Sequence, residues 1–173
     1  MISLSDNEFS VISFLVRNFS ERLTIRSIAK KLGFSPAGVF NILKKLEGRG
    51  IATGEKLGTG LFYSINFENR IAVHLAAVVM LYSEHEIKGI DVEQLKEAKS
   101  AILANKTLLL LTDNVTFLDI KIPETEIIIK TEDELVALLR KRDKKMLELI
   151  KNCIVLFGEN KIVDVIKKCM PRF

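Results

Sequence analysis

One face of the segment between residues 35 and 48 carries an amide and a cation among small or apolar side chains. On the other face, Val39, Leu43 and Leu46 recur at helical spacing and predict the buried side of a helix. Amides and cations on a helix can read base edges in the major groove of DNA. The segment therefore predicts a DNA-reading surface made of Pro36, Ala37, Phe40, Asn41 and Lys44.

A second helix is predicted directly before this surface, separated from it by a tight turn. Thr24 can cap that helix, Gly33 can close it in the left-handed conformation, and Ser35 with Pro36 can open the next one. The helix after Thr24 has an apolar stripe of Ile25, Ile28, Ala29 and Leu32.

Supporting elements are predicted on both sides of the helix pair. Ser5 and Glu8 form a capping box before a helix, and residues 19–23 read as a polar break after it. Residues 51–55 and 61–65 are short enough to pair as a hairpin around the glycine-rich segment 56–60. The N-terminal helix has a stripe predicted to be buried, made of Phe9, Ile12, Leu15, Val16 and Phe19.

The run from Ser35 to Asn66 resembles the recognition helix and wing of archaeal and bacterial winged helix-turn-helix transcription regulators, and the resemblance covers residues 1–67. Its marks are the run 43–47, the strand entry at 50–51, the wing tip at 58–60 and the aromatic return strand at 61–63. The resemblance implies that the second helix reads the major groove and that the hairpin touches phosphate or the minor groove. It implies DNA contacts at Arg26, Lys30, Ser35, Ala37, Phe40, Asn41, Lys44, Lys56 and Thr59.

Two departures from that family leave an alternative open. The predicted wing has only Lys56 as a cation, and the recognition helix has no arginine, the commonest reader of guanine. Phe40 can contact a thymine methyl, or it can pack on the wing or on a partner. The alternative is a winged-helix adaptor that grips a partner protein through Phe40 and the wing.

The charge distribution favours the N-terminal part as the site of contact with DNA. The net charge is +4, and residues 1–67 hold nine Lys or Arg against five Asp or Glu, whereas the remainder holds seventeen of each. Such an excess is typical of a phosphate-facing surface, although it is also ordinary for a segment of this size. No apolar run is long enough for a membrane span and no secretory signal is visible, so a cytoplasmic protein is expected. Its composition suggests a thermophilic source, and the family resemblance implies an archaeal one.

Residues 68–86 are predicted to form a linker helix that is apolar almost all round. One small domain cannot cover such a helix, so we expect it to meet its own copy in a homodimer. The expected dimer interface consists of Ile71, Leu75, Val78, Val79 and Tyr82.

Residues 87–173 read as a small α/β domain. Asp91 and Gln94 are predicted to cap a helix with Val92, Leu95, Ala98, Ile102 and Leu103 inward. Strands are expected at 107–112, 115–120, 126–130 and 153–157. Helices are expected after Thr131, over 145–152 and after Gly158. The predicted fold is thus α+β, or mixed: a winged helix-turn-helix, a linker helix and a small α/β domain.

The tail from Glu148 to Lys168 resembles the end of minimal nucleotidyltransferase domains. That family needs a Gly-Ser turn and two alternating carboxylates on one strand, but the chain has no Gly-Ser pair and offers only Asp119. We therefore expect no catalytic residues and a scaffold, dimerising or ligand-sensing domain, with an enzyme as a weaker third alternative. The two cysteines and two histidines match no zinc spacing, so no metal or cofactor is predicted. The expected partners are double-stranded DNA and a second copy, and a small-molecule effector is left open.

Overall fold

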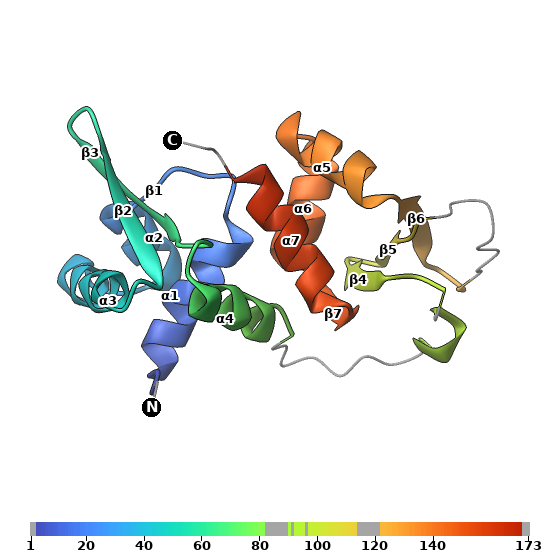
Figure 1. The fold of residues 1–173 in the computed structure, drawn as a ribbon, viewed down its shortest axis with the longest axis horizontal. Helices are drawn as coiled ribbons and strands as arrows, with labels where there is room; N and C mark the ends of the chain where they lie inside the picture. The colour runs from blue at the N-terminus through green and yellow to red at the C-terminus, as the bar shows by residue number, and fades with distance from the viewer. Residues whose placement is uncertain (1–2, 82–89, 91, 96, 114–121, 171–173) are drawn as a thin grey trace. The chain divides into compact units, whose positions relative to one another are not determined.

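The computed structural model describes residues 3–81, 90, 92–95, 97–113 and 122–170 (Figure 1). The described residues form a mixed α+β structure with seven α-helices, a short 3-10 helix and two small sheets. The chain divides into two compact units, residues 1–79 and 80–173. The division falls inside the helix α4 (Arg70–Leu81).

Three helices of the first unit begin at the caps predicted from the sequence. Helix α1 (Asp6–Arg17) has the capping box of Ser5 and Glu8, and Thr24 caps α2 (Ile25–Leu32). Gly33 ends α2 with φ 71°, a left-handed conformation that suits glycine. Helix α3 (Pro36–Gly48) begins after Ser35, whose hydroxyl accepts a hydrogen bond from the Gly38 amide.

The sheet of the first unit has three strands in the order β1-β3-β2. Strands β2 (Ala52–Leu57) and β3 (Gly60–Ile65) form the predicted hairpin, with Gly54 opposite Tyr63. Its loop is shorter than the predicted 56–60, because Leu57 still pairs with Gly60 and leaves only residues 58 and 59 unpaired. Figure 1 shows the hairpin extending well beyond the helices of the unit.

The predicted polar break at residues 19–23 was wrong at Leu23, whereas Phe19 is buried, as the stripe of the N-terminal helix predicted. Phe19 and Leu23 are 5% and 3% exposed. Leu23 pairs with Tyr63 in the short strand β1 (Leu23–Thr24), so this apolar side chain joins the core through the sheet. In α1, Val11 is buried although the stripe omitted it, and Phe9 is only half-buried.

The second unit is a four-stranded sheet with α-helices from its C-terminal part. Strand order is β6-β5-β4-β7, and β5 pairs with β6 in parallel whereas the other pairs are antiparallel. The strands are β4 (Ser100–Ala104), β5 (Thr107–Leu111), β6 (Glu126–Lys130) and β7 (Ile154–Phe157). The helices are α5 (Glu132–Arg140), α6 (Lys144–Asn152), α7 (Glu159–Cys169) and the 3-10 helix η1 (Val92–Leu95).

The C-terminal elements agree closely with the sequence-based predictions. Thr131 and Glu134 form the predicted capping box of α5, and Asp143 caps α6. Gly158 joins β7 to α7 with φ 72°, and a Cβ placed there would lie 2.3 Å from the Lys99 carbonyl oxygen. Only glycine fits that junction.

The predicted helix that included Ile102 and Leu103 was wrong. Those residues lie in β4, and Ala98 lies between η1 and that strand. Strands β4 and β5 are joined by Asn105 and Lys106, which have φ 47° and 62°, the conformation of a two-residue hairpin loop. Strand β4 was missed because it is buried on nearly every residue and does not alternate, and because apolar residues at 98, 102 and 103 also fit a helical period. The predicted strand 115–120 and the capping residue Asp91 lie outside the described residues.

The sequence predicts no membrane-spanning segment. Within the described ranges, no helix is long and apolar enough to cross a membrane.

Candidate nucleic-acid interface

Helix α3 divides sharply into a buried and an exposed face. Val39, Leu43 and Leu46 are completely buried, as predicted. The predicted DNA-reading residues Pro36, Ala37, Phe40, Asn41 and Lys44 are all exposed. Phe40 is 42% exposed, so this large apolar side chain presents much of its surface to solvent. The folded helix therefore presents these five residues to solvent.

The N-terminus of α3 is fixed by its own residues. The Oγ of Ser35 accepts from the Gly38 amide at 3.1 Å, and Pro36 occupies the first turn. Ser35 is exposed but its hydroxyl already satisfies one of the free amides of the helix start. Ser35 thus orients the helix as well as lying on its accessible end.

The predicted phosphate contacts on α2 and the hairpin are also exposed. Arg26 and Lys30 lie on α2, Lys56 lies on β2, and Thr59 lies in the hairpin loop. Within the described part of the chain, none of these three cations has an ion-pair partner. Their charges are therefore available to a polyanion.

Lys44 differs from those cations because it already has a partner. Its Nζ lies 2.7 Å from Oε2 of Glu47, three residues further along α3. The hydrogen bond and the negative charge of Glu47 raise the pKa of Lys44. Glu47 was not singled out from the sequence, although the spacing of three on an exposed helix face predicts such a pair.

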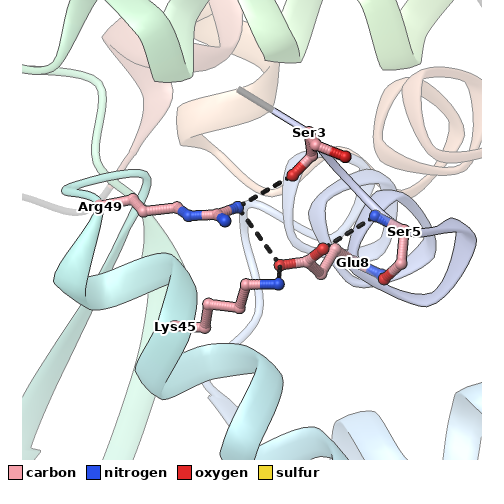
Figure 2. A network of polar contacts seen from close by, with 5 residues as sticks. All are labelled: Ser3, Ser5, Glu8, Lys45 and Arg49. Atoms are coloured by element: carbon pink, nitrogen blue, oxygen red, sulfur yellow. Dashed lines mark hydrogen bonds and ion pairs between the residues drawn. The ribbon is translucent and has the colours of Figure 1, made fainter. Parts of the chain in front are cut away.

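The opposite side of α3 is tied to α1 by a buried carboxylate (Figure 2). Glu8 is 2% exposed, and its Oε1 lies 2.9 Å from Nζ of Lys45 and 3.4 Å from Nη1 of Arg49. Its Oε2 accepts from the Ser5 amide at 2.8 Å. Arg49 also donates to the Ser3 carbonyl oxygen at 3.2 Å. This network holds the C-terminal half of α3 against the start of α1.

The surroundings of Glu8 favour its charged form. Burial acts to raise the pKa of Glu8, but the Ser5 amide and the hydrogen bond and charge of Lys45 outweigh it, and the pKa falls below its ordinary value of 4.5. The carboxylate is therefore ionised at neutral pH and pairs with both cations.

Helix α4 exposes only part of the predicted dimer interface. Ile71 and Val78 are 43% and 50% exposed, and Leu75 is half-buried. Val79 is 1% exposed and so lies on the covered side, whereas Leu81, which was not predicted, is 46% exposed. Tyr82 and the rest of the predicted linker, residues 83–86, lie outside the described residues. The accessible apolar stripe is Ile71, Val78 and Leu81.

The second unit brings together few groups that could do chemistry. Cys153 is buried and Cys169 is half-buried. Among the residues that the structure describes, no group of three or more His, Cys, Asp or Glu could hold a metal ion. Asp119, the carboxylate expected on a strand, is outside the described ranges.

The sequence matches no protein-family model. A search of curated proteins also finds no match.

Proposed function

We propose that residues 1–67 form a winged helix-turn-helix domain that binds double-stranded DNA in the cytoplasm, and that the chain acts as a homodimeric transcription regulator. In this proposal α3 enters the major groove and the β2–β3 hairpin is the wing. Arg26 and Lys30 meet phosphate from α2, and Lys56 and Thr59 do so from the wing.

One observation carries the proposal: every predicted reading residue of α3 is exposed, while Val39, Leu43 and Leu46 on the other face are fully buried. A helix that lies in a groove must present its side chains without exposing its core. The order of elements, with two capped helices followed by a long hairpin, is also what the family resemblance implies.

The test is selection of binding sites from a random pool of duplex DNA by the full chain, followed by affinity measurements at two salt concentrations. The double variant Asn41→Ala, Lys44→Ala should lose the selected sequence, and its salt slope should fall by about one unit. Lys144→Ala, at an exposed lysine of the second unit, is the matched control and should bind as the wild type. If no sequence is enriched and the double variant binds like the control, the proposal is wrong.

The homodimer is proposed to form through the exposed stripe of α4. Ile71 and Val78 are seven residues apart and Leu81 follows three later, so the three share one helix face. A second copy is the occupant that such a self-complementary stripe fits. Light scattering should show a dimer for the wild type and a monomer for Val78→Lys. Ala137→Lys, on an exposed position of α5, should remain a dimer, and a monomeric wild type would refute this part.

The second unit is proposed to serve as a non-catalytic scaffold that sets the dimer or senses a small molecule. The strands β4, β5 and β7 carry no carboxylate, whereas a two-metal nucleotidyl transfer needs alternating acids on one strand. Magnesium-dependent nucleotide transfer that is abolished by Asp119→Asn would instead establish an enzyme.

A protein adaptor is the second candidate, and the exposure of Phe40 and Leu61 favours it. Phe40 on α3 and Leu61 on β3 are 42% and 37% exposed, and aromatic residues are common anchors of protein interfaces. In that case duplex binding would be weak and nearly independent of salt, and Phe40→Ala would abolish capture of the partner.

A further inference from the structure

The hydroxyl of Tyr63 is buried beside the proposed DNA-reading helix and has no hydrogen-bond partner. Tyr63 lies on β3 and is 2% exposed. Its Oη is the one buried side-chain oxygen or nitrogen in the described part of the chain without a partner. An unsatisfied buried hydroxyl destabilises a folded protein, so its presence here calls for a cause.

The carboxylate of Glu47 is an acceptor that lies close to the ring of Tyr63. Gly54 lies opposite Tyr63 in the hairpin, and a Cβ on Gly54 would be 2.9 Å from Cε1 of Tyr63 and 3.1 Å from Oε1 of Glu47. The ring of Tyr63 and the free oxygen of Glu47 therefore border the same small space. Lys44 takes the other oxygen, Oε2, at 2.7 Å.

The charges of this group are already coupled in the free protein. Burial raises the pKa of Tyr63, the charge of Lys44 opposes this, and the charge of Glu47 adds to it. Tyr63 thus lies within electrostatic range of both members of the ion pair. Moving either charge will therefore change the electrostatic potential at the Tyr63 hydroxyl.

We propose that Glu47 and Tyr63 are positioning residues that control the availability of Lys44 to DNA, an inference that rests on the proposed function. In the free protein Glu47 holds Lys44. When a DNA phosphate binds the Lys44 ammonium, Glu47 turns inward and accepts a hydrogen bond from the Tyr63 hydroxyl.

The exchange has a simple electrostatic basis. A phosphate attracts the ammonium of Lys44 and repels the carboxylate of Glu47, so the two groups separate. The released carboxylate can accept a hydrogen bond on its inner side, and the Tyr63 hydroxyl is the unpaired buried group close to it. The hydroxyl is then satisfied only in the DNA-bound state. Removing it should therefore stabilise the free protein and weaken the complex.

Tyr63→Phe in the full chain tests this pair of opposite effects. Its melting temperature should rise by about 4 °C, since the orphan hydroxyl is gone. Its affinity for mixed-sequence duplex DNA should fall about fivefold, because the turned carboxylate has lost its donor. A purely structural role for Tyr63 would move both measurements in the same direction.

Variants at Lys44 and Glu47 test whether the effect of Tyr63→Phe on duplex affinity acts through Lys44. In Lys44→Ala, the added Tyr63→Phe change should alter duplex affinity less than about twofold, since there is no ammonium to exchange. Glu47→Gln should bind the duplex more tightly than the wild type, whereas Glu55→Gln on the wing is the matched control for loss of one negative charge.

The outcomes separate this inference from the proposed function. If the wild type binds duplex and Lys44→Ala lowers the salt slope, but Tyr63→Phe binds as the wild type, only the positioning role is overturned. An equal loss from Tyr63→Phe with and without Lys44 would overturn it as well. If the wild type does not bind duplex at all, both proposals are wrong.

Discussion

Lys44 and Lys45 are neighbours in the sequence of α3, but their ammonium groups lie in very different surroundings. Lys45 pairs with Glu8, whose side chain is 3% exposed and which also receives Arg49 and a backbone amide. Lys44 pairs with Glu47, whose side chain is 33% exposed. The helix therefore uses one lysine to fix its position, whereas the other is paired with a partly exposed carboxylate. Two adjacent residues of one type need not share one role.

The largest effect should come from removing the cations around Glu8. In Lys45→Met, Arg49→Met the buried carboxylate loses both charge partners and cannot be hydrated, which should cost about 3 kcal/mol of unfolding free energy. Urea unfolding of the full chain measures this. Lys44→Met is the matched control and should leave the urea midpoint in place. Equal effects of the two changes would remove the distinction between the two sides of α3.

Removing the carboxylate itself should lower the free energy of unfolding by less, because the side chains of Lys45 and Arg49 can then reorient and be hydrated by solvent. Glu8→Gln should lower the unfolding free energy at neutral pH by about 2 kcal/mol. The folded-state pKa of Glu8 is lowered, so its contribution is present above its ordinary value of 4.5 and is lost as the pH falls below it. Wild type and Glu8→Gln should therefore converge in urea midpoint in acid. A constant difference across that pH range would contradict this assignment.

Two glycines test the packing beside Glu47 and Tyr63 at the level of a single methyl group, with Gly54 next to these residues and Gly48 as the unpacked control. A Cβ on Gly54 would meet Tyr63 and Glu47, so Gly54→Ala should destabilise by about 1 kcal/mol. A Cβ on Gly48, the last residue of α3, would meet nothing within 4 Å, so Gly48→Ala should stabilise by about 0.5 kcal/mol. Thermal unfolding of both variants measures the difference. If both variants change stability in the same direction, the space between Gly54 and Tyr63 is not tightly packed.

The smallest effect on stability is expected at the exposed pair. Glu47→Gln breaks the contact with Lys44, but both side chains are solvated, so the urea midpoint should not change. The expected change is in the titration of Lys44, whose pKa should fall towards its ordinary value without Glu47. NMR titration of the lysine side chains checks this, and an unchanged Lys44 would mean that the pair does not persist in solution.

Local chemistry explains which parts of the fold could be predicted from the sequence. The capping boxes at Ser5 and Thr131, the closing Gly33 and the hairpin around Gly58 each depend on residues within a few positions of one another. Such signals can be read without knowing the tertiary structure. The exposed face of α3 followed from the same periodicity.

The incorrect predictions concern residues whose structure depends on distant parts of the chain. Leu23 became a strand residue only because Tyr63, forty positions later, was there to pair with it. Ile102 and Leu103 fit a helical stripe equally well until the hairpin loop at Asn105 and Lys106 is known. The same holds at the site: the sequence offered Lys44, but the role assigned to Glu47 depends on Tyr63 from a distant strand.

The short strand β1 has a consequence for motion within the first unit. Thr24 is the last residue of β1, paired with Phe62 of the hairpin, and it is also the residue that caps α2. No residue separates the two roles, so β3 cannot part from β1 without loosening the start of α2. Amide hydrogens of both elements should therefore exchange with solvent as one cooperative unit. The hairpin and the start of α2 should therefore open together and not one after the other.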